Sequence, residues 1–332
     1  MRRQSEAATA LWFKVSRLDR RLKALLRTIQ SAVAASLCRR TPKDAPCRLN
    51  RKLLLCNPVI HTGLKSQQIA VAVIPARYSA TRLPGKPLLP IAGKPLIVWV
   101  AERARAAHSV SRTIVATDDT RIATAADEAG FDVVMTRADH KTGTDRIAEV
   151  AHNLHADIIV NVQGDEPLID PATIDRAVEA LAEDPAAQMS TTYESIADAG
   201  EVMSPSVVKV AFDSDGYATM FSRRPIPLSH QAVEKHGSLE AAIRSEPALL
   251  FHFKKHTGLY AYRRSFLLEF TRWPQSERER AESLEQMRAL DRGVKIKVVE
   301  AASRSIGVDT EEDLQRVRAI LEAKPLAVVS QS

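Results

Sequence analysis

From residue 69 onward, short apolar runs alternate with amphipathic stretches. The apolar runs have the length of buried strands and cover residues 69–74, 113–116, 133–135 and 158–162. The stretches between them have helical spacing, open with proline or polar residues that start helices, and cover residues 95–107, 121–129 and 145–154. Because strands that alternate with helices are typical of parallel sheets, this pattern predicts a doubly wound α/β fold.

The pattern changes in the second half of the chain. Two shorter apolar runs, 207–212 and 217–221, flank Asp215 and Gly216, a pair that favours a hairpin turn. Residues 230–247 are polar without a clear period and predict a loop. We therefore expect this half to be mixed and partly antiparallel.

The first 68 residues differ from the rest in composition. They hold fifteen Lys and Arg against three acids, so the net charge of +7 for the whole chain becomes −5 from Ile69 onward. A mildly acidic body argues against nucleic acid as a partner. All three cysteines also lie in this segment, at even nine-residue spacing, which does not match the close pairs of a zinc site.

Within this segment, apolar residues between Leu11 and Val33 recur at three- and four-residue intervals and predict a basic amphipathic helix. Such a helix can direct a protein to an organelle or lie on a membrane surface. We favour the alternative that residues 1–68 are a dispensable extension, because terminal segments tolerate change. No apolar run is long enough to span a bilayer, so we expect no transmembrane segment. We expect a cytoplasmic protein that contacts a membrane only if this helix is used.

The loop after the first strand, residues 75–87, is rich in cations. Arg77, Arg82 and Lys86 lie within ten residues, and Gly85 permits a close approach of the backbone. Ligands of open α/β sheets bind at this carboxyl edge, so the loop is suited to a triphosphate. The absence of the Walker A and Gly-x-Gly-x-x-Gly patterns argues against kinases, GTPases and dehydrogenases. The alternative is a basic surface turn.

Two aspartates are candidates for a magnesium site. Asp165 follows the fourth strand, and hard cations prefer carboxylate oxygens, although a turn aspartate is an equal alternative. Asp309 precedes Thr310 and Asp313, which have the spacing of a capping box and so leave Asp309 outside the helix. By contrast, Asp118 and Asp119 are expected to cap the helix that starts near Arg121.

The third group of candidates is suited to hydroxyl and carboxylate oxygens. His256, Gly258 and Tyr260 occupy alternate positions of a strand and should face one side. Glu285 and Gln286 lie in residues 283–290, where an apolar stripe predicts a helix, so a solvated helix face is their default interpretation. Buried structural roles for His256 and Tyr260 are the alternative.

Five motifs together closely resemble the 3-deoxy-manno-octulosonate (Kdo) cytidylyltransferases, the CMP-Kdo synthetases of Gram-negative bacteria. They occur in unbroken order between residues 69 and 321 and read IPARYSATRLPGKPL (74–88), TRADHKTGTDR (136–146), NVQGDEP (161–167), KHTGLY (255–260) and GVDTEEDL (307–314). Thr142 and Asp145 stand where family members often have Ser and Glu, which are conservative differences.

The resemblance implies a nucleotide-diphospho-sugar transferase fold, Rossmann-like and three-layered with a mixed, mainly parallel sheet. It also implies CTP and Kdo as substrates, Mg²⁺ as cofactor, and a homodimer. The domain would span residues 69–322, with sugar binding and dimerisation in residues 200–300 and a tail at 323–332. No single residue is expected to act as an obligatory base.

The roles that this resemblance assigns fall into four groups. Arg77, Lys86 and Asp165 would be catalytic, and Asp165 and Asp309 would bind magnesium. The nucleotide would contact Ala76, Arg77, Lys86, Thr142, Gly143 and Arg146. The sugar acid would contact Gln163, His256, Tyr260, Glu285 and Gln286.

Alternatives remain at this point. Within enzymes, the chain could be a cytidylyltransferase for another acidic sugar, such as a nine-carbon sialic acid, or a transferase that acts on a sugar 1-phosphate. From a different class, it could be a catalytically silent module that senses nucleotide or docks on a membrane.

Overall fold

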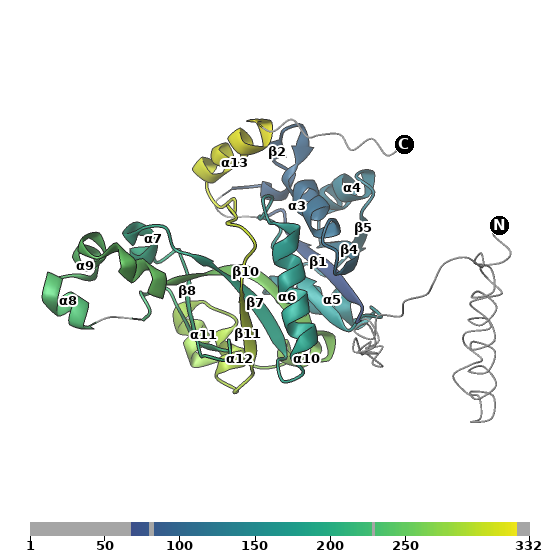
Figure 1. Ribbon diagram of the computed structural model, residues 1–332. Coiled ribbons are helices and arrows are strands. Elements are labelled where there is room, and N and C mark those ends of the chain that lie inside the picture. Colours follow the sequence, from purple (N-terminus) through teal and green to yellow (C-terminus); the bar gives the residue numbers. More distant parts are fainter. Residues whose placement is uncertain (1–67, 80–82, 228–229, 324–332) are drawn as a thin grey trace, which may run out of the picture. The chain divides into compact units, whose positions relative to one another are not determined.

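The four strands predicted in the first half form one parallel group. The computed structural model describes residues 68–79, 83–227 and 230–323 (Figure 1). Strands β1 (Ala70–Ala76), β4 (Val110–Thr117), β5 (Asp132–Met135) and β6 (Ile158–Asn161) lie in the order β6-β1-β4-β5 and are all parallel. Their carboxyl ends therefore share one edge of the sheet, as the alternating pattern predicted.

Helices cover both faces of this sheet and give it three layers. Along β1, Ala70, Ala72 and Ile74 pack into one core, and Val71 and Val73 pack into the other, as expected for side chains that alternate along a strand. The first core is covered by α3 (Leu96–Arg105), α4 (Thr120–Glu128), α6 (Pro171–Glu183) and α13 (Glu311–Ala323). The second is covered by α5 (Gly143–His152), α10 (Arg264–Phe270) and α12 (Met287–Leu290). The predicted three-layer α/β fold is confirmed.

The second half extends the same sheet beyond β6. Strands β10 (Lys254–Arg263), β7 (Met189–Ser195) and β11 (Ile296–Glu300) follow in the order β6-β10-β7-β11. Only β10 is antiparallel to both neighbours on this path, whereas β11 is parallel to β7. Because β10 is reversed, its first residues lie at the edge where β1 and β6 end.

The predicted hairpin also forms at this side of the sheet. Strands β8 (Lys209–Phe212) and β9 (Ala218–Ser222) pair antiparallel. Between them, Gly216 has a φ of 78°, and the amide of Asp213 donates to the Tyr217 carbonyl at 2.9 Å. A separate two-stranded sheet, β2 (Pro90–Ile91) and β3 (Lys94–Pro95), follows the short 3₁₀ helix η3 (Lys86–Leu88).

The loop predicted over residues 230–247 is wrong, because this region forms short helices. These are α8 (His230–His236), α9 (Leu239–Ser245) and the 3₁₀ helix η4 (Pro247–His252), which lie near α7 (Ala199–Met203) (Figure 1). A small core of their own stabilises them, formed by Ile196, Val202, Leu239, Ile243 and Phe253. Helices of one or two turns are too short to give a clear period in the sequence.

The helix predicted over residues 283–290 is also wrong in its first half. Helix α11 (Glu277–Glu282) begins at a capping box formed by Ser276 and Glu279, and it ends at Ser283, which has a φ of 52°. Residues 284–286 form a turn before α12 begins at Met287. A left-handed residue ends an α-helix, so the apolar stripe continues across a break in the backbone.

The predicted basic helix, Arg82 and the three cysteines all lie outside the described residues. Over the part of the chain that the structure does describe, no helix is long and apolar enough to cross a membrane. The boundaries predicted for the extension and the tail stay predictions.

Candidate active site

Lys86 joins three segments of the chain at the carboxyl edge of the sheet. Its Nζ lies 2.7 Å from Oδ2 of Asp165, 3.1 Å from Oδ1 of Asp309, and 2.8 Å from the carbonyl oxygen of Val308. The three partners come from the segments that follow β6 and precede α13, whereas Lys86 begins η3 after β1. The two aspartates that the sequence singled out therefore converge on one cation.

The electrostatics of Lys86 follow from this arrangement. Its side chain is 15% exposed, and burial by itself would lower the pKa of the ammonium. The charges and hydrogen bonds of Asp165 and Asp309 outweigh burial, and the pKa of Lys86 is raised. The amine therefore stays protonated and presents a fixed positive charge at the sheet edge.

The loop that carries Lys86 is held at its base by an aromatic side chain. Gly85 has a φ of 69°, and its amide donates to the Tyr78 carbonyl at 3.1 Å. A Cβ at position 85 would lie 3.1 Å from the Tyr78 ring, whose other contact is the Arg121 guanidinium at 3.4 Å from the ring centroid. Glycine is thus required here both for its backbone conformation and for the approach of Tyr78.

Arg77 and Arg146 add two more cations to this edge. Arg77 follows β1 directly, and its Nη2 donates to the carbonyl of His140 at 2.7 Å. Arg146, on the first turns of α5, is fully buried, donates from Nη1 to Thr136, and has Nη2 at 3.1 Å from the Asp118 carboxylate. Within the described part of the chain, Nε and Nη2 of Arg146 have no partner in hydrogen-bond geometry.

Two consequences follow for the charges around Arg146. Burial lowers the pKa of its guanidinium. The Asp118 charge raises this pKa, and the charge of the neighbouring Arg77 lowers it further. The expectation that Asp118 caps a helix is wrong, because its carboxylate faces Arg146; Asp119 alone caps α4 by accepting from the Arg121 amide. Nε of Arg146 is a buried donor without an acceptor among the described residues, and such a donor is suited to a ligand that brings one.

The remaining nucleotide candidates, Ala76, Thr142 and Gly143, lie next to these cations. Ala76 ends β1 with a buried side chain, so any contact with a ligand would come from its main chain. Thr142 is the N-cap of α5 in a capping box with Asp145, and Gly143 is the first residue of the helix. The start of α5 is therefore fixed at the same edge as Arg77.

The candidates on β10 do face one side, but a bulge separates them. His256 pairs with Tyr193 and Tyr260 with Thr191, so three residues of β10 stand opposite one residue of β7. The bulge adds two residues, which keeps the alternation in phase, and the His256 and Tyr260 ring centroids lie 5.4 Å apart. Gln163, from the segment after β6, donates to the carbonyl of Gly258 within the bulge at 3.2 Å.

His256 is neutral and has a defined tautomer. Thr191 Oγ1 donates to the Leu259 carbonyl at 2.7 Å, so His256 Nε2, 2.9 Å from the same hydroxyl, must be the donor of that second bond. Burial lowers the pKa of His256 to about 3. The other ring nitrogen, Nδ1, therefore carries a lone pair that can accept a hydrogen bond.

Glu285 connects the sugar candidates to the start of α5. Its carboxylate accepts from Thr142 Oγ1 at 3.2 Å and from Thr144 Oγ1 at 2.6 Å. Burial raises the pKa of Glu285, and burial followed by the Glu285 charge raises that of Tyr260. Gln286 is 5% exposed, so the default interpretation of a solvated helix face is wrong. The break in the helix at Ser283 turns these side chains inward.

A family model described as Cytidylyltransferase matches residues 71–296. The 3-deoxy-manno-octulosonate cytidylyltransferase of Geobacter sulfurreducens is 52% identical over 246 residues, which cover 74% of this chain and 96% of the relative. That of Trichlorobacter lovleyi is 50% identical over 249 residues, which cover 75% and 96%. The chain belongs to the cytidylyltransferase family. Relatives at this identity place it among the 3-deoxy-manno-octulosonate cytidylyltransferases, so the resemblance carried by the five motifs is confirmed.

A solved structure of a related enzyme agrees with this family assignment. It is a CMP:2-keto-3-deoxy-manno-octonic acid synthetase complexed with CTP, 43% identical, with a TM-score of 0.69. The similarity covers 77% of this chain and 99% of that one. The cytidylyltransferase thus has a nucleotidyltransferase fold, and it is an enzyme of the nucleotidyltransferase class.

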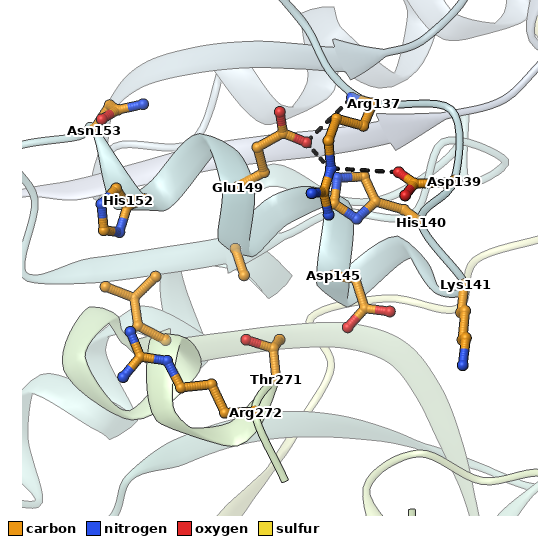
Figure 2. A pocket seen from close by; sticks show the side chains of 12 residues that line it. Arg137, Asp139, His140, Lys141, Asp145, Glu149, His152, Asn153, Thr271 and Arg272 are labelled. Atoms are coloured by element: carbon orange, nitrogen blue, oxygen red, sulfur yellow. Dashed lines mark hydrogen bonds and ion pairs between the residues drawn. The ribbon is translucent and has the colours of Figure 1, made fainter. Parts of the chain in front are cut away.

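A groove of about 800 Å³ lies beside α5 (Figure 2). It is lined by Arg137, residues 139–141, the outer face of α5 and the end of α10, and Figure 2 shows the Glu149 carboxylate facing Arg137 and His140, with interactions to both. Lys86, Asp165 and Asp309 do not line it. The groove is therefore distinct from the edge where these charged groups of the cytidylyltransferase meet.

Four residues that sequence reasoning did not select connect the segment of Asp165 to the segment that ends at Asp309. Glu166, Glu194, Lys255 and Ser305 form one connected group of hydrogen bonds and ion pairs. Burial raises the pKa of Glu166 to about 7, although the hydrogen bond from Ser305 opposes this. Glu166 and Lys255 lie inside two of the quoted motifs, which is the signal that could have identified them.

Proposed function

We propose that this chain transfers CMP from CTP to Kdo, forming CMP-Kdo for lipopolysaccharide synthesis and releasing pyrophosphate. The observation that carries the proposal is the convergence of Asp165 and Asp309 on Lys86, with Arg77 and Arg146 along the same sheet edge. The names of the relatives, and of the neighbour complexed with CTP, support the choice of substrates.

The cations and the nucleotide fit each other in charge. Arg77, Lys86 and Arg146 would offer positive groups to the triphosphate, and Nε of Arg146, which has no hydrogen-bond partner among the described residues, would bind an acceptor of the nucleotide. The anomeric hydroxyl of Kdo attacks the α-phosphorus in line. As that oxygen bonds to phosphorus, the bond to the bridging oxygen breaks, pyrophosphate leaves with the electron pair, and the hydroxyl proton passes to solvent. Positioning and charge stabilisation supply the rate enhancement.

The donor set at this edge fits magnesium. Asp165 and Asp309 approach the same cationic atom, Lys86 Nζ, at 2.7 and 3.1 Å, and both offer hard carboxylate oxygens. Among the described residues, no group of three or more His, Cys, Asp or Glu side chains forms a metal site. Two carboxylates are the usual protein contribution where substrate phosphates complete the coordination. When bound there, the ion would neutralise charge that develops on the phosphate oxygens.

The acceptor side offers groups that suit a hydroxylated sugar acid. His256 Nδ1 is an acceptor for a sugar hydroxyl, the Tyr260 ring lies beside it, and Gln163 lies between Asp165 and β10. Glu285 would orient the same region through Thr142 and Thr144. Further properties belong to the proposal: the enzyme forms a homodimer and works in the cytoplasm, and residues 1–68 are dispensable.

The test is pyrophosphate release by the purified chain with CTP, Mg²⁺ and Kdo. Parallel reactions replace Kdo by sialic acid, replace CTP by other nucleotides, or add EDTA. The variant Asp165→Asn removes one candidate ligand, and Asp132→Asn is the matched control, because Asp132 is an exposed partner of Arg112 far from the sheet edge.

The outcomes separate the hypotheses. Release that needs CTP, Kdo and metal, is lost in Asp165→Asn and persists in Asp132→Asn supports the proposal. Release with another sugar only would keep the chemistry and change the acceptor. Binding of CTP without turnover of any pair would contradict the enzyme and favour the nucleotide-sensing module. Gel filtration and removal of residues 1–68 test the dimer and the extension.

A further inference from the structure

Asp309 lies at the end of a segment that has no regular secondary structure. Residues 301–310 connect β11 to α13 without helix or strand, and Figure 1 shows this connection crossing from the sheet to the helix. Asp309 must nevertheless be held opposite Asp165, since its carboxylate lies 3.1 Å from Lys86 Nζ. The segment therefore depends on contacts with its surroundings for its position.

Two acidic side chains, Glu166 and Glu194, hold this segment by accepting hydrogen bonds from one of its residues, Ser305. The Ser305 hydroxyl donates to Oε2 of Glu166 at 2.5 Å, and its amide donates to Oε1 of Glu194 at 2.9 Å. Glu194 is 3% exposed, and its second oxygen pairs with Lys255 Nζ at 3.0 Å. Ser305 is thus fixed from both sides by hydrogen bonds to two carboxyl groups.

The contacts continue from Ser305 toward the site. A Cβ at Gly307 would lie 3.0 Å from Oε1 of Glu166, so glycine lets the segment pass against this carboxyl group. The amide of Val308 donates to the Asp165 carbonyl at 2.8 Å, and the Val308 side chain is buried. Asp165 and Glu166 therefore hold residues 305–308 next to Asp165, the first candidate magnesium ligand.

We propose that Glu166 and Glu194 are positioning residues that hold Ser305 and thereby place the Asp309 carboxylate opposite Asp165. Neither carboxyl group needs to touch substrate or metal for this role. The inference rests on the proposed function, because it assumes that Asp309 and Asp165 bind magnesium together.

The experiment compares small changes at Ser305 and Glu166 in the full chain. Ser305→Ala and Glu166→Ala remove the hydroxyl contact, whereas Ser305→Thr and Glu166→Gln retain a donor or an acceptor. Ser303→Ala is the matched control. Ser303 lies two residues before Ser305, and its hydroxyl donates to Asp170 at 2.9 Å and not to Glu166 or Glu194. Asp309→Asn reports the loss of the candidate ligand itself.

Two readouts are measured. Amide hydrogen exchange of the peptide that contains residues 303–309, followed by mass spectrometry without metal or nucleotide, reports whether the segment is held. Pyrophosphate release against Mg²⁺ concentration gives the midpoint of the metal dependence and the rate at saturation. We expect Ser305→Ala and Glu166→Ala to exchange about tenfold faster and to raise the midpoint about tenfold, with saturated rates within about twofold of wild type.

The conservative variants and the Ser303 control should match wild type in both readouts. Unchanged exchange and midpoint in Ser305→Ala and Glu166→Ala, beside a raised midpoint in Asp309→Asn, would overturn the inference and leave the proposed function intact. A wild-type chain that releases no pyrophosphate would contradict the proposed function. In that case the exchange readout alone decides whether Glu166 holds the segment.

Discussion

The ammonium of Lys86 and the carboxylate of Asp165 form an ion pair of 2.7 Å between residues 79 positions apart in the sequence. The contact follows from strand order, because β1 and β6 are parallel neighbours and the segments after them emerge at the same edge. The Lys86 side chain is 15% exposed, so solvent screens this ion pair only in part. This pair is the geometric centre of the proposed reaction.

Replacing Lys86 by methionine should lower kcat/KM for CTP by about 10²–10³-fold, because a preorganised charge at the phosphates is lost. Steady-state pyrophosphate release measures the effect. Lys235→Met is the control, since Lys235 forms an exposed ion pair with Glu246. A loss of less than about threefold in Lys86→Met would show that the ammonium does not stabilise the transition state.

Replacing Gly85 by alanine should cost more stability than the same change at Gly93. Both residues have positive φ, 69° and 79°, so alanine at either site costs about 1–2 kcal/mol in backbone strain. Only at Gly85 would the new Cβ also press on Tyr78, whereas nothing lies within 4 Å at Gly93.

Urea unfolding of the two variants gives the comparison. Gly85→Ala should also weaken CTP binding, because the displaced Tyr78 lies at the base of the cation loop. Equal stability losses and equal CTP affinity in the two variants would contradict a role for the Tyr78 contact.

Replacing Thr144 by valine should lower the free energy of unfolding by about 1–2 kcal/mol, because the partly buried Glu285 carboxylate loses a hydrogen bond of 2.6 Å. Thr113→Val is the matched control, since the buried Thr113 hydroxyl has no hydrogen-bond partner within the described residues. That change should be neutral or stabilising. Chemical denaturation at pH 7.5 measures both, and similar losses would show that the Glu285 contact adds nothing.

His256 should make the protein less stable as the pH falls below neutrality. In the unfolded chain a histidine takes up a proton near pH 6.5, whereas burial holds the pKa of folded His256 at about 3. The unfolded state therefore binds more protons between these values, and stability falls as pH falls. From pH 6.5 to pH 5 this group contributes a loss of about 2 kcal/mol.

Unfolding free energies of wild type, His256→Gln and His108→Gln at pH 7, 6 and 5 test this expectation. The slope should be smaller in His256→Gln than in wild type, and unchanged in His108→Gln, because the His108 side chain is exposed. Identical slopes in all three proteins would mean that His256 titrates normally in the folded state.

Much of the site could be predicted because its residues follow strands or caps that have local signatures. Asp165 was placed at the sheet edge by the end of the fourth apolar run. Asp309 was left outside α13 by the capping box of Thr310 and Asp313, whose reciprocal bonds measure 3.0 and 3.2 Å. Such signals need only a few neighbouring residues, so the sequence is sufficient for them.

Other features depend on distant parts of the chain and have no local signature. The bulge in β10 is defined by its pairing with β7, and the inward turn of Glu285 depends on the left-handed Ser283. Asp118 was expected to be a cap like Asp119, but Arg146 of α5 decides its role. Glu166 lies inside a quoted motif, but its hydrogen bond to Ser305 depends on a contact that only the fold creates.

The contact between Lys86 and Asp309 spans 223 positions, and it has a consequence for synthesis of the chain. The parallel strands and the cation loop are complete once residue 165 has been made, yet the second carboxylate is made 144 residues later. A nascent or truncated chain that stops before residue 308 lacks both this carboxylate and the Val308 carbonyl that Lys86 binds. The charged centre of the chain is therefore incomplete until residue 309 has left the ribosome.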